Sequence, residues 1–417
     1  MPVETSGHDR ALLSGSNGDA ALLAMRIVLE TAEVMGADRL IDIASAHVDG
    51  CLYHGVAGLE FAERLVVGGA RVAVPTTLNV GYLDLLHPER YRGDGATAAN
   101  ARKQMDAYVA MGCRSTWTCA PYQLPGRPEF GQHVAWAESN AIVFCNSVLG
   151  ARTNRYGDFI DICAAITGRA PYAGLHRDDE RRATLVLRLD GIPSRLLASD
   201  ALYPVLGHVA GRVAGAAVPA IVGLPRDASE DRLKSLGAAA ASSGSVAMFH
   251  AVGITPEAPT LEAATGGADV PRDTVTLERL RLARDELTTA NGDHLRAVCV
   301  GTPHASLAEL ERLATLLAEQ RTRVPVWVNT GRDVLAEAER RGVSRSLTSA
   351  GVNLVTDTCT YIAPLLDGGP VMTDSAKWAW YAPANIGVQV TFGSLEECVR
   401  SAIEGYVVRD AELWGDG

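Results

Sequence analysis

The sequence predicts an α/β protein in which parallel or mixed sheets are flanked by helices. Short apolar, β-rich runs alternate with longer helical segments, most regularly after about residue 182. Such alternation is typical of βαβ units, whose strands form parallel sheets. A chain of 417 residues has room for two or three domains. Its 47% hydrophobic and 21% charged residues are ordinary for a globular protein.

We predict four segments: a flexible N-terminus over residues 1–17, a first α/β domain over 18–181, a βαβ domain over 182–270 and another α/β domain over 271–417. The first domain shows the patterns of helices and strands in turn. Helices are expected at 19–35, 59–69 and 98–112, and strands at 40–44 and from 70 to a break at Pro75. The polar residues that follow these strands favour a site at the strand ends.

The second half repeats the alternation. Strands are expected at 183–189, 218–224, 245–254, 295–304 and 324–331, and helices at 203–215, 229–244, 274–287, 306–320 and 394–405. A Pro- and Gly-rich turn over 254–271 is expected to separate the last two domains. Ser306 and Glu309 have the spacing of a capping box, which marks the start of one helix.

Composition excludes several function classes. The net charge of −11, from 38 basic and 49 acidic residues, disfavours nucleic-acid binding, which needs a basic surface. No apolar run reaches the roughly 18–20 residues of a membrane span, and the polar start does not resemble a signal peptide. Eight scattered Cys residues suit a reducing compartment. We therefore expect a cytoplasmic protein that binds neither nucleic acid nor membrane.

Three Cys residues are candidate metal ligands. Cys119 lies in Thr-Cys-Ala-Pro-Tyr and Cys359 in Asp-Thr-Cys-Thr-Tyr, both polar turns that directly follow apolar segments. Cys51 follows Asp49 and Gly50. Taken singly, each is more often a packed thiol than a ligand. Together they indicate loop thiols directed at a common point.

Several charged residues are candidates for binding or proton transfer. Lys377, among small polar and aromatic residues, is placed to bind a carboxylate or to move a proton. Arg152 and Arg155 have the fork geometry that binds a carboxylate, or they pair with nearby acids. His47 and His54 are either acid–base groups or structural histidines.

The candidate residues lie within longer sequence motifs. In chain order it contains SAHVDGCLYHG, VPTTLNVGYLDL, TCAPY, WAESNAIVFCNSVLGARTNRYGD, GTPH, DTCTY and MTDSAKWAWYAPAN. These motifs closely resemble the large subunit of aconitase X, a divergent branch of the aconitase superfamily. The resemblance runs from Ala20 to Val407, and the block from Trp136 to Asp158 is highly specific.

The resemblance implies a fold and a partner. The fold is the aconitase-like three-domain core, lacking the swivel domain. That domain is then expected as a separate small subunit, which in the superfamily contributes part of the active site. The enzyme is accordingly expected to be active only with both subunits.

The resemblance also implies an iron centre held by three Cys, either a two-iron, two-sulfur cluster or a mononuclear iron. Cys119 and Cys359 match the family's ligand motifs. Archaeal members have Gly-Cys-Pro-His where this chain has Gly-Thr-Pro-His, with Thr302 at the Cys position. Cys51 is therefore the preferred third ligand.

Two substrates are known for the family, and the motifs around Cys51 and Thr302 resemble the bacterial cis-3-hydroxy-L-proline dehydratases. The expected reaction forms Δ1-pyrroline-2-carboxylate. Our hypothesis assigns proton or carboxylate chemistry to Lys377, Ser375 and His47. It assigns substrate contacts to Asn146, Ser147, Arg152, Asn154, Thr76 and Thr77. The alternatives are the large subunit of a phosphomevalonate dehydratase and a non-catalytic, metal-binding structural subunit.

Overall fold

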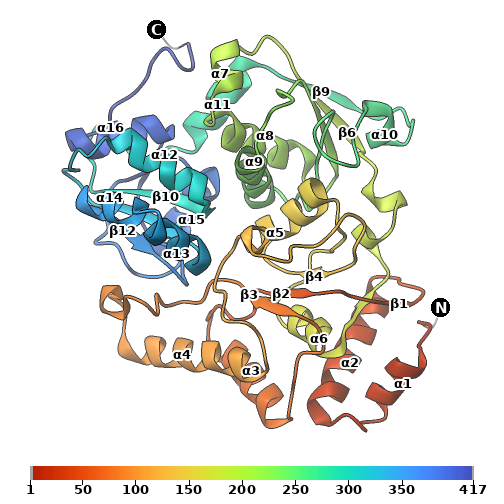
Figure 1. Cartoon of the computed structure of the whole chain (residues 1–417). Helices are drawn as coiled ribbons and strands as arrows, with labels where there is room; N and C mark the ends of the chain where they lie inside the picture. Colours follow the sequence, from red (N-terminus) through yellow and green to blue (C-terminus); the bar gives the residue numbers. More distant parts are fainter. Residues whose placement is uncertain (1–2, 416–417) are drawn as a thin grey trace. The chain divides into compact units, whose positions relative to one another are not determined.

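The computed structural model describes residues 3–415, which divide into two compact units (Figure 1). Unit 1 contains residues 3–83 and 93–182, and unit 2 contains residues 84–92 and 183–415. Both are built of parallel sheets and helices, which confirms the predicted α/β class.

Unit 1 holds the first six helices and five strands. The helices are α1 (Gly7–Leu13), α2 (Asp19–Val34), α3 (Val56–Val67), α4 (Gly95–Ala110), α5 (Ser139–Phe144) and α6 (Ile160–Thr167). The strands are β1 (Leu40–Asp42), β2 (Ala46–Val48), β3 (Thr76–Leu78), β4 (Ala135–Trp136) and β5 (Arg169–Pro171). Short helical turns are η2 (Pro121–Gln123), the π-helix η3 (Cys145–Leu149), η4 (Gly174–His176) and η5 (Asp179–Arg181).

The central sheet of unit 1 is parallel, with β2 between β3 and β4. His47 on β2 pairs with Thr77 on β3 and with Trp136 on β4. Strands β1 and β5 form a separate antiparallel pair. Because the three central strands are parallel, the loops after Val48, Leu78 and Trp136 leave the same edge of the sheet.

The N-terminal segment differs from the expected flexible tail. Helix α1 begins after Ser6, which forms a capping box with Asp9. Asp9 is buried and forms an ion pair with Arg169, 2.8 Å away on β5. A partner 160 residues away along the chain is invisible to local pattern, so the sequence did not reveal this anchor.

Unit 2 holds two parallel sheets with their helices. The strands are β6 (Leu185–Leu189), β7 (Pro219–Val222), β8 (His250–Ala251), β9 (Arg272–Val275), β10 (Ala297–Ala305), β11 (Val326–Thr330), β12 (Val352–Val355), β13 (Val371–Thr373) and β14 (Val390–Phe392). The helices are η1 (Pro88–Arg90), α7 (Ser194–Ala198), α8 (Leu202–Ala214), α9 (Glu230–Ser243), α10 (Leu261–Thr265), α11 (Leu277–Glu286), α12 (Leu307–Leu317), α13 (Arg332–Arg340), α14 (Val343–Ser349), α15 (Ala376–Ile386) and α16 (Leu395–Glu404).

The first sheet of unit 2 has the order β8-β7-β6-β9. Strand β9 pairs with β6 in parallel, so this sheet extends past the predicted boundary at residue 270. Residues 254–271, which the sequence predicted to be a turn between two domains, contain α10 and return the chain to the same sheet. Thr276 caps α11, which explains why that helix begins three residues later than predicted.

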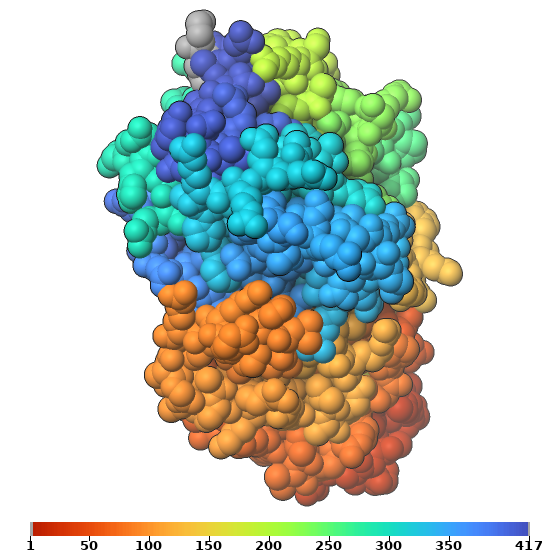
Figure 2. Space-filling view, turned by 60° about the vertical axis from the view of Figure 1, so that its left-hand side comes forward, coloured from red at the N-terminus to blue at the C-terminus, as the bar shows by residue number. Residues whose placement is uncertain are grey.

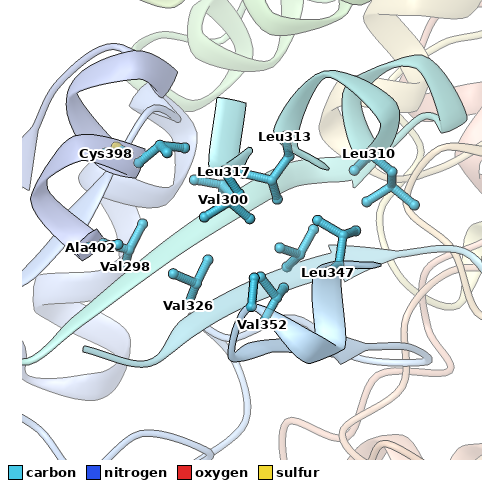
Figure 3. Packing of buried hydrophobic residues seen from close by; sticks show 14 of the residues in the cluster. Val298, Val300, Leu310, Leu313, Leu317, Val326, Leu347, Val352, Cys398 and Ala402 are labelled. Carbon is cyan, nitrogen blue, oxygen red and sulfur yellow. The ribbon is translucent and has the colours of Figure 1, made fainter. Parts of the chain in front are cut away.

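The second sheet has the order β12-β11-β10-β13-β14 and covers a large core. Figure 3 shows this core, where Val300 of β10 lies beside Leu313 and Leu317 of α12, and Val298 lies beside Ala402 of α16. The predicted capping box of Ser306 and Glu309 is confirmed at the start of α12.

Helices α12, α13 and α14 pack on one another and lie on the outer surface of unit 2, in the cyan to blue region of Figure 2. These helices carry exposed charged residues, such as Arg340 and Arg341 of α13 and the turn after it. Across residues 3–415, no helix combines the length and apolar character needed to cross a bilayer.

Candidate active site

The loop that carries Cys119 is fixed at the carboxyl edge of the unit 1 sheet. The backbone N–H of Thr118 donates to the carbonyl of Leu78 at 3.1 Å, so the chain leaves beside β3. The side chain of Asn140 donates to the Cys119 carbonyl at 2.8 Å and accepts from the hydroxyl of Tyr122 at 2.6 Å. Cys119 itself is buried. The scaffold therefore holds this thiol beside the carboxyl end of β3.

Cys51 lies at the same edge, in the loop after β2, and is fully buried. Its Sγ lies 3.3 Å from the carbonyl oxygen of Asn79 and 3.5 Å from that of Val48. Burial, reinforced by Asp49 and Asp161, raises the pKa of the thiol well above its ordinary value. The chain alone thus keeps Cys51 protonated, and metal binding would have to displace that proton.

Asp161 of α6 fixes the Cys51 loop. Its Oδ2 accepts backbone N–H bonds from Asp49 at 2.7 Å and from Gly50 at 3.1 Å. Burial, with Glu138 next in effect, raises the pKa of Asp49 to about 8. Burial likewise raises the pKa of Asp161 to about 7. The sequence analysis did not single out these carboxyls, because no local motif indicates that they converge.

His47 is buried in the middle of the same sheet. Its Nδ1 lies 2.8 Å from Oγ1 of Thr77, and its ring lies 5.9 Å from that of Trp136. Burial lowers the pKa of His47 to about 3, so the ring is neutral. The Thr77 hydroxyl can donate to the Ala46 carbonyl, 3.4 Å away. Nδ1–H of His47 then donates to Thr77, and Nε2, which has no hydrogen-bond partner within residues 3–415, keeps its lone pair.

The other predicted substrate contacts in unit 1 are largely engaged with their own chain. Thr76 donates to the Val74 carbonyl at 2.9 Å. Asn146 donates to the carbonyl of Thr153 at 2.9 Å and accepts from its N–H at 3.0 Å. Asn154 donates to the carbonyl of Ala173 at 2.7 Å. These contacts shape the scaffold. Ser147, in the same predicted set, is buried within η3.

The two arginines of this region have different surroundings. Arg152 donates to the His176 carbonyl at 3.0 Å and forms an ion pair with Asp178. Arg155 forms no ion pair or hydrogen bond with any residue of the described chain, and the residue as a whole is exposed. Partial burial of its guanidinium lowers the pKa of Arg155 below its ordinary value. An unpaired, partly desolvated guanidinium is the more available of the two for an anionic ligand.

Arg155 also lies at the carboxyl edge of the central sheet of unit 1. Residues 151–154 run beside β4, because His133 and Arg152 form a parallel bridge and Thr153 accepts from the Trp136 N–H at 2.9 Å. The next residue along, Arg155, therefore lies beyond the carboxyl end of β4.

Unit 2 brings Cys359 and His304 together. A ring nitrogen of His304 and Sγ of Cys359 lie within 4.8 Å of each other, and both residues are buried. Nε2 of His304 lies 3.3 Å from the Thr358 carbonyl, so Nε2–H can donate there and leave the lone pair on Nδ1. Burial lowers the pKa of His304 to about 4, which keeps the ring neutral. The GTPH motif, which lies at the end of β10, was the available sequence signal for His304, which was not predicted as a ligand.

Lys377 and Ser375 lie at the start of α15, also in unit 2. Ser375 caps this helix by accepting the Trp378 N–H at 3.1 Å. Lys377 is buried, and the next residue, Trp378, donates its indole N–H to Thr360, which directly follows Cys359. The structure thus groups Cys359, His304, Ser375 and Lys377 at the carboxyl ends of parallel strands.

The donors fit a metal centre. Cys sulfur and neutral imidazole are soft or intermediate ligands that suit iron and other transition metals. Cys119, His304 and Cys359 are side chains of this type, and all are buried. Buried donors of this type at the strand ends of parallel α/β domains suit a metal-binding α/β protein.

Within that class, the chain belongs to the aconitase X family. The aconitase X first, second and third domains match residues 2–179, 183–286 and 295–404. A solved structure of aconitase X from Thermococcus kodakaraensis, in its holo form, has a TM-score of 0.87 and 33% identity. The likeness covers 96% of this chain and all of the other. Both findings confirm the resemblance and the predicted fold.

Relatives with established names are dehydratases. The cis-3-hydroxy-L-proline dehydratase of Pseudomonas aeruginosa is 47% identical over 97% of this chain and 71% of its own length. The phosphomevalonate dehydratase large subunit of Methanothermobacter thermautotrophicus is 39% identical over 94% of this chain and 97% of its own length.

Proposed function

We propose that this chain is the large subunit of a hydro-lyase that dehydrates cis-3-hydroxy-L-proline to Δ1-pyrroline-2-carboxylate. The observation that carries the proposal is the 47% identity, over nearly the whole chain, to a dehydratase of that substrate. The buried donors and acid–base groups at the strand ends are compatible with such chemistry.

The metal centre in this proposal is held by side chains that the sequence motifs indicate. Cys119 from unit 1 and Cys359 from unit 2 are its first two ligands. Cys51 is the predicted third ligand, and His304 is the alternative that its position beside Cys359 supports. The centre is a two-iron, two-sulfur cluster or a single iron. Bound iron supplies Lewis-acid assistance to a departing hydroxyl group.

The substrate's stereochemistry favours elimination. Its hydroxyl and carboxylate share one ring face, so the hydrogen on Cα lies on the face opposite the hydroxyl. A base on one face removes that proton, and the C–H electrons form the double bond as the C–O bond breaks. The enamine then tautomerises to the imine. Lys377 and neutral His47 are the acid–base candidates, and Ser375 is a hydroxyl donor to the substrate carboxylate.

Charge on the carboxylate rises as the Cα proton leaves, so the site needs a cationic partner for it. Of the two predicted arginines, Arg155 is supported by its unpaired guanidinium, whereas Arg152 is engaged with His176 and Asp178. Other substrate contacts remain proposals. They are Asn146, Ser147, Asn154, Thr76 and Thr77.

A small subunit that carries the swivel domain is the proposed partner. The archaeal relative is named a large subunit, and this chain spans 97% of its length. The same chain spans only 71% of the Pseudomonas relative. The remainder of that relative has the extent of a further domain. The 39% identity to a phosphomevalonate dehydratase large subunit supports phosphomevalonate dehydration as the second candidate function.

A coupled assay tests the proposal. The chain would be co-expressed with its small-subunit candidate and purified anaerobically. Cis-3-hydroxy-L-proline would then be followed through a pyrroline-carboxylate reductase and a reduced nicotinamide. Turnover that needs both chains and is lost on iron chelation is expected. A folded, iron-loaded complex that dehydrates only phosphomevalonate would move the assignment to the second candidate, and one inert to both would support a structural role.

A further inference from the structure

A cavity of about 410 Å³ lies wholly within unit 2, at the carboxyl ends of β10 and β13. Val300 to Pro303 and Ala305 line it on the β10 side, and Asp374 and Ser375 line it on the β13 side. From β10 the chain passes through α12 to β11, and from β13 through α15 to β14, on opposite sides in the sheet order. Adjacent parallel strands whose connections diverge form a topological switch point, the usual ligand site of such sheets.

The cavity reaches Ser375, but neither His304 nor Cys359 lines it. Pro303 and Ala305 line it, whereas His304 between them directs its ring toward the Thr358 carbonyl. Its volume falls within the range of roughly 300–1,000 Å³ that is usual for small-molecule sites. A ligand bound there would not be a ligand of the metal centre.

The cationic side chains of the cavity already have acidic partners. Lys234 is bound by Asp231, 2.8 Å away, and by Glu309. Arg232 pairs with Asp200, and Arg312 pairs with Asp200 and Glu396. None of these three cations is left over for an anionic ligand.

The acids of the cavity are in excess. Its lining carries five carboxylates and three cations. Asp374 forms no ion pair with any side chain of residues 3–415 and faces the cavity half-buried. A half-buried carboxylate without an ion-pair partner is unfavourable in free energy, and a bound cation would offset that penalty.

The rest of the lining is apolar or hydroxylic. Leu310, Leu313 and Val328 provide a hydrocarbon wall, and Thr302 and Ser375 provide hydroxyl groups. We propose that this cavity binds a small ammonium-bearing molecule with a hydrocarbon body, whose ammonium is held by Asp374. The site shares the Ser375 hydroxyl with the proposed dehydratase centre, but Asp374, which holds the ammonium, has no role in that centre.

Calorimetric titration of the full chain with pyrrolidine tests the site. Burial and the neighbouring Glu309 raise the pKa of Asp374 to about 7, so the titration is made at pH 8, where the carboxylate predominates. We expect saturable binding of pyrrolidine and none of cyclopentanol, a ring of similar size without the charge. Asp374→Asn should weaken binding by about tenfold or more.

Matched variants make the result decisive. Asp227→Asn removes the same charge from an exposed position of the same lining and should change affinity less than about twofold. Ala308→Phe, at an exposed lining position of α12, should block the cavity without loss of fold. Cys359→Ala should bind pyrrolidine normally, which separates this site from the metal centre. Absence of binding, or equal binding by Asp374→Asn and Ala308→Phe, would overturn the proposal.

Discussion

The indole N–H of Trp378 donates a 2.9 Å hydrogen bond to Oγ1 of Thr360. Trp378 directly follows Lys377 in α15, and Thr360 directly follows Cys359, so this bond joins two of the sequence motifs. Asn329 of β11 adds to the connection, because its Oδ1 accepts the Thr360 N–H at 3.0 Å. The positions of the proposed acid–base group and of the proposed metal ligand are therefore coupled through buried polar contacts.

The first prediction concerns this bond. Trp378→Phe should lower the free energy of unfolding by about 1–3 kcal/mol, because it removes a buried donor and some packed volume. Urea unfolding measures the loss. A double-mutant cycle with Thr360→Val separates the hydrogen bond from the packing. Strict additivity of the two substitutions would show that the bond contributes nothing.

The second prediction concerns Lys377. Lys377→Met should lower turnover by about 10²–10⁴-fold, the usual contribution of a positioned acid–base group. Circular dichroism would confirm that the variant is folded. Lys103→Met, at an exposed position of α4, is the control and should retain normal turnover. A Lys377 variant with full activity would remove this residue from the mechanism.

The third prediction concerns the metal ligands. Cys119→Ala and Cys359→Ala should each lose most of the bound iron, measured by elemental analysis after anaerobic purification. Cys398→Ala is the matched control, since Cys398 is buried in the hydrophobic core of the third domain. It should keep its iron while losing some stability. Equal iron in all three variants would exclude Cys119 and Cys359.

Iron content also distinguishes the two candidates for the third metal ligand, Cys51 and His304. Burial and two nearby acids oppose ionisation of Cys51, whereas His304 is neutral and holds a lone pair beside Cys359. Iron loss in Cys51→Ala with retention in His304→Gln would support the sequence-based assignment. The reverse pattern would make His304 the ligand.

Local sequence pattern was sufficient to predict those features whose signal lies within a few adjacent residues. The capping box of Ser306 and the polar turns around Cys119 and Cys359 were predicted because a strand end or helix start is encoded in adjacent residues. The role of Arg152 could not be read this way. Its partners, His176 and Asp178, lie more than twenty residues further along the chain.

The same limit applies to the fold. Strand β9 returns to the sheet of β6 after a segment that reads as a linker, because strand pairing depends on distant residues. Helix α1 has an ordinary capping signal, but its anchor on Arg169 is a tertiary contact. Local propensity therefore identified most elements, and long-range pairs decided the ends of the domains.

The fourth prediction distinguishes the two arginines. Arg155→Gln should raise the KM for the substrate by roughly 10- to 100-fold, the effect of losing a charge-assisted hydrogen bond, with little change in stability. Arg152→Gln should instead lower stability by about 1 kcal/mol, through loss of its bond to the His176 carbonyl, and leave KM nearly unchanged. The opposite outcome would restore Arg152 as the carboxylate ligand.

The last prediction concerns acid stability. Burial alone would raise the pKa of Asp9, but hydrogen bonds from Ser6 and the charge of Arg169 outweigh it and hold this pKa below its ordinary value of 3.8. A group with a lowered folded-state pKa stabilises the fold above its unfolded pKa. That stabilisation is lost as the pH falls through the folded value. The Asp9 contribution is therefore intact at neutral pH, begins to fall near the unfolded pKa of about 4, and is gone once the pH lies below the folded value.

Asp9→Asn separates this contribution from general acid unfolding. At pH 7 the variant should be less stable by about 3 kcal/mol, because Arg169 loses its buried partner and keeps only Asp42, which is exposed. As the pH falls from 6 to 3, stability should decrease more steeply in the unmodified chain, so the two urea-unfolding curves should converge. Parallel curves over this range would mean that Asp9 does not titrate with unfolding and that α1 is held by its apolar contacts alone.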